Sequence, residues 1–235
     1  MKPLGWKRWL SYLFELPIEQ TSSEHNPLLQ VLLSRGRYQL CTENAVYSFE
    51  DLYDNFYRAF RQIKIEQLPI QNVLILGLGL GSIPRMLERN FHLNFHYTAI
   101  ELDEEVIYLA NKYVLQHLSS PIEIICTDAL AYLAQNDQQF DLICMDIFLD
   151  DTVPTPFEQV SFLEQLKNAL APDGTLLYNR LAATTADQER SRAFFEGPFR
   201  AVFPEGRLLE VLPNYVLRGR EEEGRMEGRG MGDGG

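Results

Sequence analysis

Short hydrophobic runs alternate with segments of helical spacing from residue 72 onward. The runs NVLILG, FHYTAIE, IEIICTD, FDLICMD and GTLLYNRL have the length and apolar content of buried strands. Alternation of such strands with helices is typical of a parallel sheet that is covered on both faces. The last two runs, RLLEVL and YVLRG, are separated by Pro213 and Asn214 and predict a closing antiparallel hairpin. We therefore expect an α/β domain over residues 71–218.

The first 70 residues have a different pattern, which predicts a small β-rich region followed by a linking helix. LLQVLLSRGRYQLCT has two apolar runs around Arg35 and Gly36, as in a hairpin. SFEDLYDNFYRAFRQI spaces its apolar residues by three and four, which predicts an amphipathic helix opened by Ser48. At the other end, residues 219–235 are rich in glycine and charge, and we expect this tail to be disordered.

Composition narrows the class of protein. Hydrophobic residues make up 46% of the chain and charged residues 23%, as in a globular protein, and no apolar run is long enough to span a membrane. The net charge is −12, so the chain lacks the basic face that binding to nucleic acid requires. An acidic surface would instead attract cations, polyamines among them.

Cysteines and histidines do not predict a metal site. The three cysteines lack the spacing of metal ligands, and Cys126 and Cys144 lie in apolar runs, which indicates buried, reduced thiols in a cytoplasmic protein. His92 and His96 are four residues apart, but strand alternation crosses that segment and no third ligand is evident.

Residues suited to ligand binding follow four successive predicted strands. They are Gly77, Gly79 and Gly81 after the first strand, Glu101 after the second, Asp128 after the third and Asp146 after the fourth. In open α/β sheets, ligands bind beyond the carboxyl ends of the strands. We therefore expect these residues to meet at one site.

The types of residue at these positions indicate a nucleoside. Glycines allow a backbone to turn close to a ligand, and a carboxylate such as Glu101 can accept both hydroxyl groups of a ribose. Asp128 could accept a hydrogen bond from an adenine amino group. The dinucleotide fingerprint Gly-x-Gly-x-x-Gly would place its third glycine at Ser82, so S-adenosylmethionine or a related compound fits better than NAD.

The segments VLILGLGLGSIPRML, AIELDEEVIYLANKYV, CTDALAYLAQ, FDLICMDIF and LKNALAPDGTLLYN resemble class I S-adenosylmethionine-dependent methyltransferases, and more narrowly spermidine synthases. The resemblance covers about residues 27–217. It implies a Rossmann-like, seven-stranded sheet and a donor that is S-adenosylmethionine or its decarboxylated form. It also implies that Glu101 holds the ribose, that Asp128 and Ala129 meet the adenine edge, and that Asp146 is the catalytic carboxylate.

The part of the family pattern that binds the amine is changed. The family loop Gly-Gly-Gly-Asp-Gly has Leu80 in place of its acid, and the family motif Asp-Ser-x-Asp-Pro has Leu149 in place of its second acid. Asp150 and Asp151 follow directly and are candidate substrate residues. The usual Tyr followed by His or Gln is replaced by Phe49 and Glu50.

Three hypotheses remain open. The first is a spermidine synthase-like transferase of polyamine biosynthesis that moves an aminopropyl group to an amine. The resemblance implies that it could form a homodimer, as the family does. The second is a methyltransferase with an apolar acceptor pocket lined by Leu80, Ile147 and Phe148. The third is a catalytically inactive, nucleoside-binding homologue.

Overall fold

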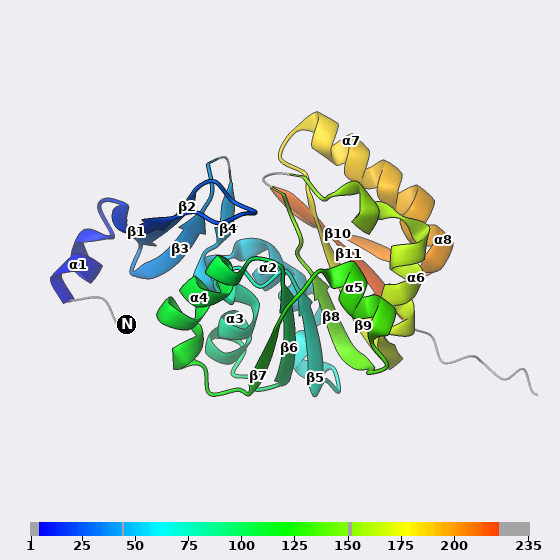
Figure 1. Ribbon diagram of the computed structural model, residues 1–235. Coiled ribbons are helices and arrows are strands. Elements are labelled where there is room, and N and C mark those ends of the chain that lie inside the picture. The colour runs from blue at the N-terminus through cyan, green and yellow to red at the C-terminus, as the bar shows by residue number, and fades with distance from the viewer. Residues whose placement is uncertain (1–4, 44, 150–151, 221–235) are drawn as a thin grey trace, which may run out of the picture.

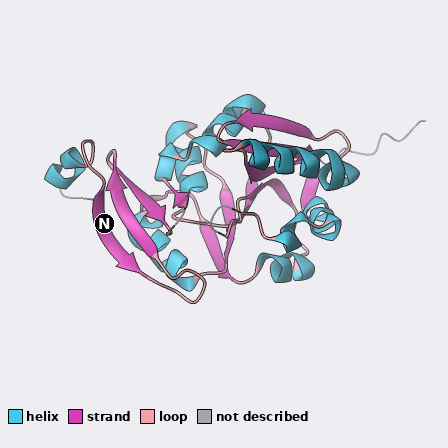
Figure 2. Ribbon diagram, turned by 90° about the horizontal axis from the view of Figure 1, so that it is seen from above, coloured by secondary structure: helices cyan, strands magenta, loops and turns pink. Residues whose placement is uncertain are grey.

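The computed structural model describes residues 5–43, 45–149 and 152–220 and contains two sheets. The N-terminal sheet has the order β1-β2-β3-β4, and its strands are β1 (Leu16–Thr21), β2 (Leu29–Ser34), β3 (Arg37–Cys41) and β4 (Val46–Ser48). All of its pairs are antiparallel. Figure 1 shows it beside a larger α/β body, and Figure 2 shows it from above at one end of the molecule.

The larger sheet has the order β10-β11-β9-β8-β5-β6-β7. Its strands are β5 (Asn72–Leu76), β6 (His96–Glu101), β7 (Ile122–Cys126), β8 (Phe140–Met145), β9 (Leu170–Leu181), β10 (Arg207–Val211) and β11 (Asn214–Arg220). The first five of these are parallel to one another, whereas β11 is antiparallel to both β9 and β10. The seven-stranded sheet with a terminal antiparallel hairpin is therefore confirmed.

Helices cover both faces of this sheet (Figure 1). The α-helices of the chain are α1 (Gly5–Leu10), α2 (Asp54–Ile63), α3 (Ser82–Asn90), α4 (Glu104–Tyr113), α5 (Ala129–Gln135), α6 (Val160–Asn168), α7 (Thr185–Phe194) and α8 (Arg200–Val202). Short 3-10 helices occupy Glu50–Leu52, Ile65–Gln67, Leu115–His117 and Thr155–Glu158, and a π-helix spans Phe195–Phe199.

Alternation along each central strand divides the core into two layers. In β5, Val73 and Ile75 pack with α2, α3 and α4, whereas Leu74 and Leu76 pack with α5, α6, α7 and α8. All four side chains are fully buried. A strand that is apolar on both faces needs helices on both faces, because either face left open would expose hydrophobic surface to water.

The N-terminal hairpin has the predicted turn. Arg35 and Gly36 both have positive φ, at 51° and 72°, and such a two-residue turn matches the twist of the strands on either side. A third hydrophobic cluster joins this sheet to α4 and includes Leu29, Leu33 and Leu109. The β-rich N-terminal region thus has its own layer of core.

Two boundaries differ from the sequence prediction. The amphipathic helix begins at Asp54 instead of Ser48, because Ser48 belongs to β4 and its hydroxyl group hydrogen-bonds to that of Ser82. This helix, α2, packs on the larger sheet, with Phe56 and Phe60 in the same cluster as the β5 side chains. The last strand reaches Arg220, so only residues 221–235 of the predicted tail lie outside the described residues.

The prediction that Cys126 and Cys144 are buried is correct for only one of the two. Cys144 is buried in β8, whereas Cys126 is exposed at the end of β7, which lies at the edge of the sheet. Edge strands have only one neighbour, so an apolar run there does not ensure burial.

Gly81 ends the glycine turn and begins α3. Its φ is +85°, and a Cβ atom there would overlap with the Leu115 side chain. We expect Gly81→Ala to destabilise the protein by about 1–2 kcal/mol, because alanine is strained at positive φ. The control is Gly197→Ala, where φ is not positive and a Cβ atom meets nothing within 4 Å. Urea midpoints measure both variants, and an equal shift for the two would contradict this account.

Candidate functional site

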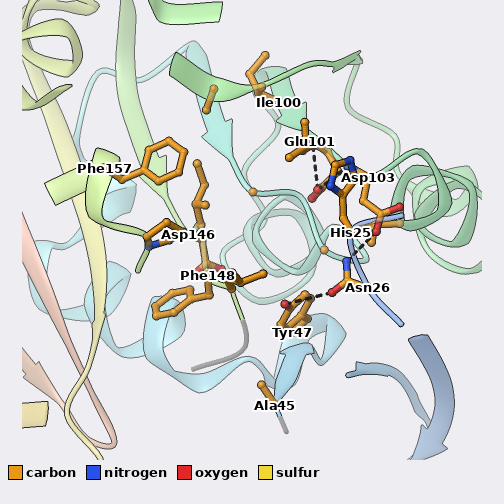
Figure 3. A pocket seen from close by; sticks show the side chains of 18 of the residues that line it. His25, Asn26, Ala45, Tyr47, Ile100, Glu101, Asp103, Asp146, Phe148 and Phe157 are labelled. Atoms are coloured by element: carbon orange, nitrogen blue, oxygen red, sulfur yellow. Dashed lines mark hydrogen bonds between the residues drawn. The ribbon is translucent and has the colours of Figure 1, made fainter. Parts of the chain in front are cut away.

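A cavity of about 720 Å³ opens at the carboxyl ends of the parallel strands, between the larger sheet and the N-terminal sheet (Figure 3). Six of the seven predicted nucleoside and catalytic residues line it, namely Gly77, Gly79, Glu101, Asp128, Ala129 and Asp146. Figure 3 shows Glu101 and Asp103 on one side of the cavity and Asp146 and Phe148 on the other. The remaining predicted residue, Gly81, is not part of the lining.

The glycine turn lets two strand ends come together. Gly77 has a φ of +88°, and a Cβ atom on it would lie 2.5 Å from the backbone oxygen of Asp146. Such an overlap with backbone cannot be relieved by rotating a side chain, so this position requires glycine. The backbone N–H of Gly77 also donates to the Ile100 oxygen, which links the ends of β5 and β6.

Glu101 is fixed at the end of β6 by backbone donors. Its Oε2 accepts from the Leu78 N–H at 3.0 Å, and its Oε1 accepts from the N–H groups of Leu102 and Asp103 at 2.9 and 3.2 Å. Burial raises the pKa of Glu101, while these hydrogen bonds act to lower it. The carboxylate thus has a set direction at the cavity wall, as a group that is to accept ribose hydroxyls must have.

Asp128 and Ala129 lie at the start of α5. One carboxylate oxygen of Asp128 caps this helix by accepting from the Ala131 N–H at 3.0 Å. The side chain is therefore held at the cavity wall, next to Thr127, which also lines it. The contact of Asp128 and Ala129 with an adenine edge stays a prediction.

Asp146 is held by neutral partners. Its Oδ1 accepts from the Asn179 side-chain amide at 2.8 Å and from the Tyr53 hydroxyl at 3.3 Å. Asn179 is fully buried, and its own oxygen accepts from the Asn214 amide at 3.1 Å. Burial raises the pKa of Asp146 to about 7, since these two hydrogen bonds only partly offset the loss of water. Asp146 can therefore take up or release a proton near neutral pH.

The N-terminal region closes the cavity through Asp103. This buried carboxylate accepts from the Asn26 amide at 2.7 Å and from the Ser23 hydroxyl, and it also caps α4. The Tyr47 hydroxyl in turn donates to the Asn26 oxygen at 3.3 Å (Figure 3). A segment before β2 is thus tied to the loop that carries Glu101.

Sequence reasoning missed several lining residues, among them Tyr53, Asn26, Tyr47 and Asn214. Tyr53 belongs to the segment SFEDLYDNFYRAFRQI, whose helical spacing predicts a place for it on an apolar helix face. Asn179 could have been recognised from the sequence as a residue with a polar partner, because an amide inside a buried apolar strand must form a hydrogen bond. It lies near the end of the fifth parallel strand, where the rule that located the other residues also applies.

The charge of the lining is of one sign. Its ionisable acids are Glu101, Asp103, Asp128 and Asp146, and among the described residues that line the cavity there is no lysine or arginine. Among the described residues of the lining, His25 is the only one with a basic side chain, and it is exposed. The cavity therefore favours a ligand with positive charge.

Leu80 does not face this cavity, contrary to the expectation for an apolar acceptor pocket. It is fully buried in the N-terminal cluster with Leu29 and Leu33. Ile147 and Phe148, the other two residues of that expectation, do line the cavity. The candidate substrate residues Asp150 and Asp151 lie outside the described residues.

Within the ranges that the structure covers, no three His, Cys, Asp or Glu side chains are grouped so as to hold a metal ion. None of the helices in those ranges has the length and apolar character to cross a membrane.

Comparison with known proteins identifies related chains. A family model for the spermine/spermidine synthase domain matches residues 63–204. A probable polyamine aminopropyl transferase of Bifidobacterium longum is 28% identical over 63% of this chain and 32% of its own length. The human eEF1A lysine and N-terminal methyltransferase is 25% identical over 60% of this chain and 22% of its own length. This chain thus spans less than two thirds of the curated relatives that it matches.

A solved structure shows the same fold. The probable spermidine synthase of Corynebacterium glutamicum superposes with a TM-score of 0.69 and 17% identity, over 88% of this chain and 80% of that one. The likeness includes a region outside the family match, because that match begins only at residue 63.

The raised pKa of Asp146 predicts how the free energy of unfolding depends on pH. Its pKa is 3.8 when unfolded and about 7 when folded, so the folded state holds the extra proton between these values. This group therefore destabilises the wild type increasingly as pH rises from about 4 to 7. Asp146→Asn removes the effect, and we expect its stability relative to the wild type to increase from pH 5 to pH 8 in urea titrations.

The matched control is Asp137→Asn, which removes an exposed carboxylate outside this cavity. It measures what the loss of one negative charge does to the pH dependence. An Asp146→Asn variant whose relative stability follows that of the control at both pH values would show that Asp146 does not titrate as described.

Proposed function

The chain belongs to the spermine/spermidine synthase domain family, and on this premise we propose that it transfers an aminopropyl group from decarboxylated S-adenosylmethionine to an amine. The observation that carries the proposal is the charge of the cavity, whose described lining has four carboxylates and neither lysine nor arginine. Both substrates of this reaction are cations, so both are favoured there.

The same observation distinguishes the two possible donors. Intact S-adenosylmethionine keeps a carboxylate, which needs a cationic or N–H partner in a partly buried site. Three backbone donors of the glycine turn are already used, since the Leu78 and Gly79 N–H groups donate to Glu101 and the Gly81 N–H donates to the Leu78 oxygen. Decarboxylated S-adenosylmethionine has only an ammonium group at the end where the intact compound also has a carboxylate, and a lining of carboxylates suits that ammonium group.

The position of each residue supports a division of roles. We assign the ribose to Glu101, which backbone donors hold at the cavity wall, and the adenine edge to Asp128 and Ala129 at the start of α5. Gly77 and Gly79 let the backbone approach the donor. Gly81 supports the turn from outside the cavity lining.

Asp146 is the proposed catalytic base. The acceptor amine must be neutral to attack, so its ammonium form first gives a proton to the Asp146 carboxylate, whose pKa of about 7 suits that transfer. The nitrogen lone pair then forms a bond to the carbon next to the sulfonium. The carbon–sulfur bond breaks at the same time, and its electron pair stays on sulfur as a neutral thioether.

The acceptor is a polyamine in this proposal. Phe148 and Phe157 line the cavity on the side of Asp146 (Figure 3), and aromatic rings there can contact the methylene groups of a diamine. The carboxylates hold its charged ends. Putrescine is the acceptor to test first, because the relatives are named as polyamine aminopropyl transferases.

Donor preference is the first test. We expect calorimetric titration to give a dissociation constant for decarboxylated S-adenosylmethionine at least about tenfold lower than for the intact compound, since one unmatched buried carboxylate costs that much or more. Tighter binding of the intact donor would instead favour methyl transfer. Binding of neither donor would favour the inactive homologue.

Substitution of Asp146 tests the reaction itself. Asp146→Asn keeps the shape of the side chain and should lower kcat for formation of spermidine from putrescine by about 100-fold or more, because it removes the proton acceptor. The donor dissociation constant should change less than about threefold, since the assigned donor contacts lie on the other strand ends. Asp137→Asn is the control, and full activity of Asp146→Asn would remove this residue from the mechanism.

A further inference from the structure

A second cavity, of about 430 Å³, lies on the other side of the N-terminal region from the cavity described above. It is enclosed by α1, the start of β3, α3 and the segment after α4. Four arginines line it, namely Arg8, Arg37, Arg85 and Arg89. Such a group is unexpected in a chain with a net charge of −12.

Two neighbouring carboxylates neutralise only part of this charge. Asp51 is buried and pairs with Arg37 through both of its oxygens, and its Oδ2 is 3.4 Å from the Nε of Arg89. Glu50 is also buried, and its Oε2 is 3.9 Å from the Nε of Arg85. Four guanidinium groups thus face two carboxylates, which leaves two positive charges unmatched.

Three of the arginines have guanidinium N–H donors that a ligand could reach. Arg8 is exposed and makes no ion pair within the described part of the chain. Arg85 and Arg89 lie one turn apart on α3, with side chains that are 23% and 37% exposed. Each guanidinium carries five N–H donors in a planar fork, and this geometry matches the oxygens of an oxyanion.

Gly36 makes room for the guanidinium group of Arg8. A Cβ atom on Gly36 would lie 3.2 Å from the Nε of Arg8, so the absence of a side chain lets this guanidinium approach the hairpin turn. Arg37 follows directly in β3 and donates from Nη1 to the Gly36 oxygen. The turn between β2 and β3 therefore brings two arginines from different elements to one wall.

We propose that this arginine-lined cavity binds an oxyanion with at least two negative charges, such as a phosphate group. The phosphate can belong to a small molecule or to a lipid headgroup. Trp6 and Trp9 of α1 are 61% and 67% exposed beside Arg8, so a membrane surface could present the group there. The site is separate from the carboxylate-lined cavity and takes a ligand of opposite charge.

The test measures binding of inorganic phosphate by calorimetry, with chloride adjusted to keep ionic strength constant. We expect the wild type to bind phosphate, and we expect Arg8→Gln and Arg89→Gln each to raise the dissociation constant about tenfold, because each removes charge-assisted hydrogen bonds. Arg200→Gln is the matched control, since it removes an exposed arginine on α8 and should leave binding unchanged. Arg8→Gln breaks no described ion pair, so it tests the site even if Arg89→Gln is unstable.

A second arm identifies the source of the phosphate. The same four proteins are sedimented with vesicles of phosphatidylcholine, either alone or with phosphatidic acid, whose phosphomonoester can carry two negative charges. Sedimentation with the anionic vesicles that is lost in Arg8→Gln and kept in Arg200→Gln assigns the site to a lipid headgroup. Phosphate binding without sedimentation assigns it to a free ligand. The proposal is overturned if Arg8→Gln and Arg200→Gln behave alike in both arms.

Discussion

The structure depends on the close approach of two backbones at the end of the central strand. Gly77 follows β5, and its missing side chain leaves room for the backbone oxygen of Asp146 at the end of β8. Hydrogen bonds from Gly77 to Ile100 and from Asp146 to Leu76 join this point to both neighbouring strands. The carboxyl ends of three strands therefore meet within one turn, and the acids that follow them face one space. A larger residue at position 77 would separate the glycine turn from the acid, and the site depends on both.

This constraint extends into the N-terminal region. Gly79 lies against Ser48, whose hydroxyl group bonds to that of Ser82 at 2.6 Å, so the turn is fixed to β4 as well as to α3. The cavities on the two sides of this junction are lined by side chains of opposite charge. Carboxylates line the cavity on the side of the strand ends, and arginines line the cavity beneath the hairpin, where Asp51 anchors two of them. An acidic protein can keep a basic hollow in this way, because buried carboxylates hold part of the arginine group in place while the rest stays accessible.

The sequence predicted the α/β fold well because its strong signals are local. Short apolar strands, glycine after the first strand and acids after the next three all follow from periodicity and from the rule for open sheets. The errors arose where tertiary contacts decide. Ser48 looked like a helix cap but belongs to a strand, since its partner Ser82 is distant in the sequence. Leu80 looked like a cavity residue but packs under the N-terminal sheet, whose position no local pattern reveals.

The partners of Asp146 show most clearly what local patterns omit. Tyr53 comes from the position just before α2 and Asn179 from the fifth parallel strand, while Asn214 of the terminal hairpin binds Asn179 in turn, so only the folded chain brings these side chains together. All three are neutral. An arginine or lysine in their place would stabilise the charged carboxylate and lower its pKa, and Asp146 would then hold no proton at neutral pH. Neutral donors orient the carboxylate while burial keeps its pKa near 7, at a cost in stability that grows as pH rises from about 4 to 7. A carboxyl group kept in this state does little to hold the fold together, and its state supports the proposed role of Asp146 in proton transfer.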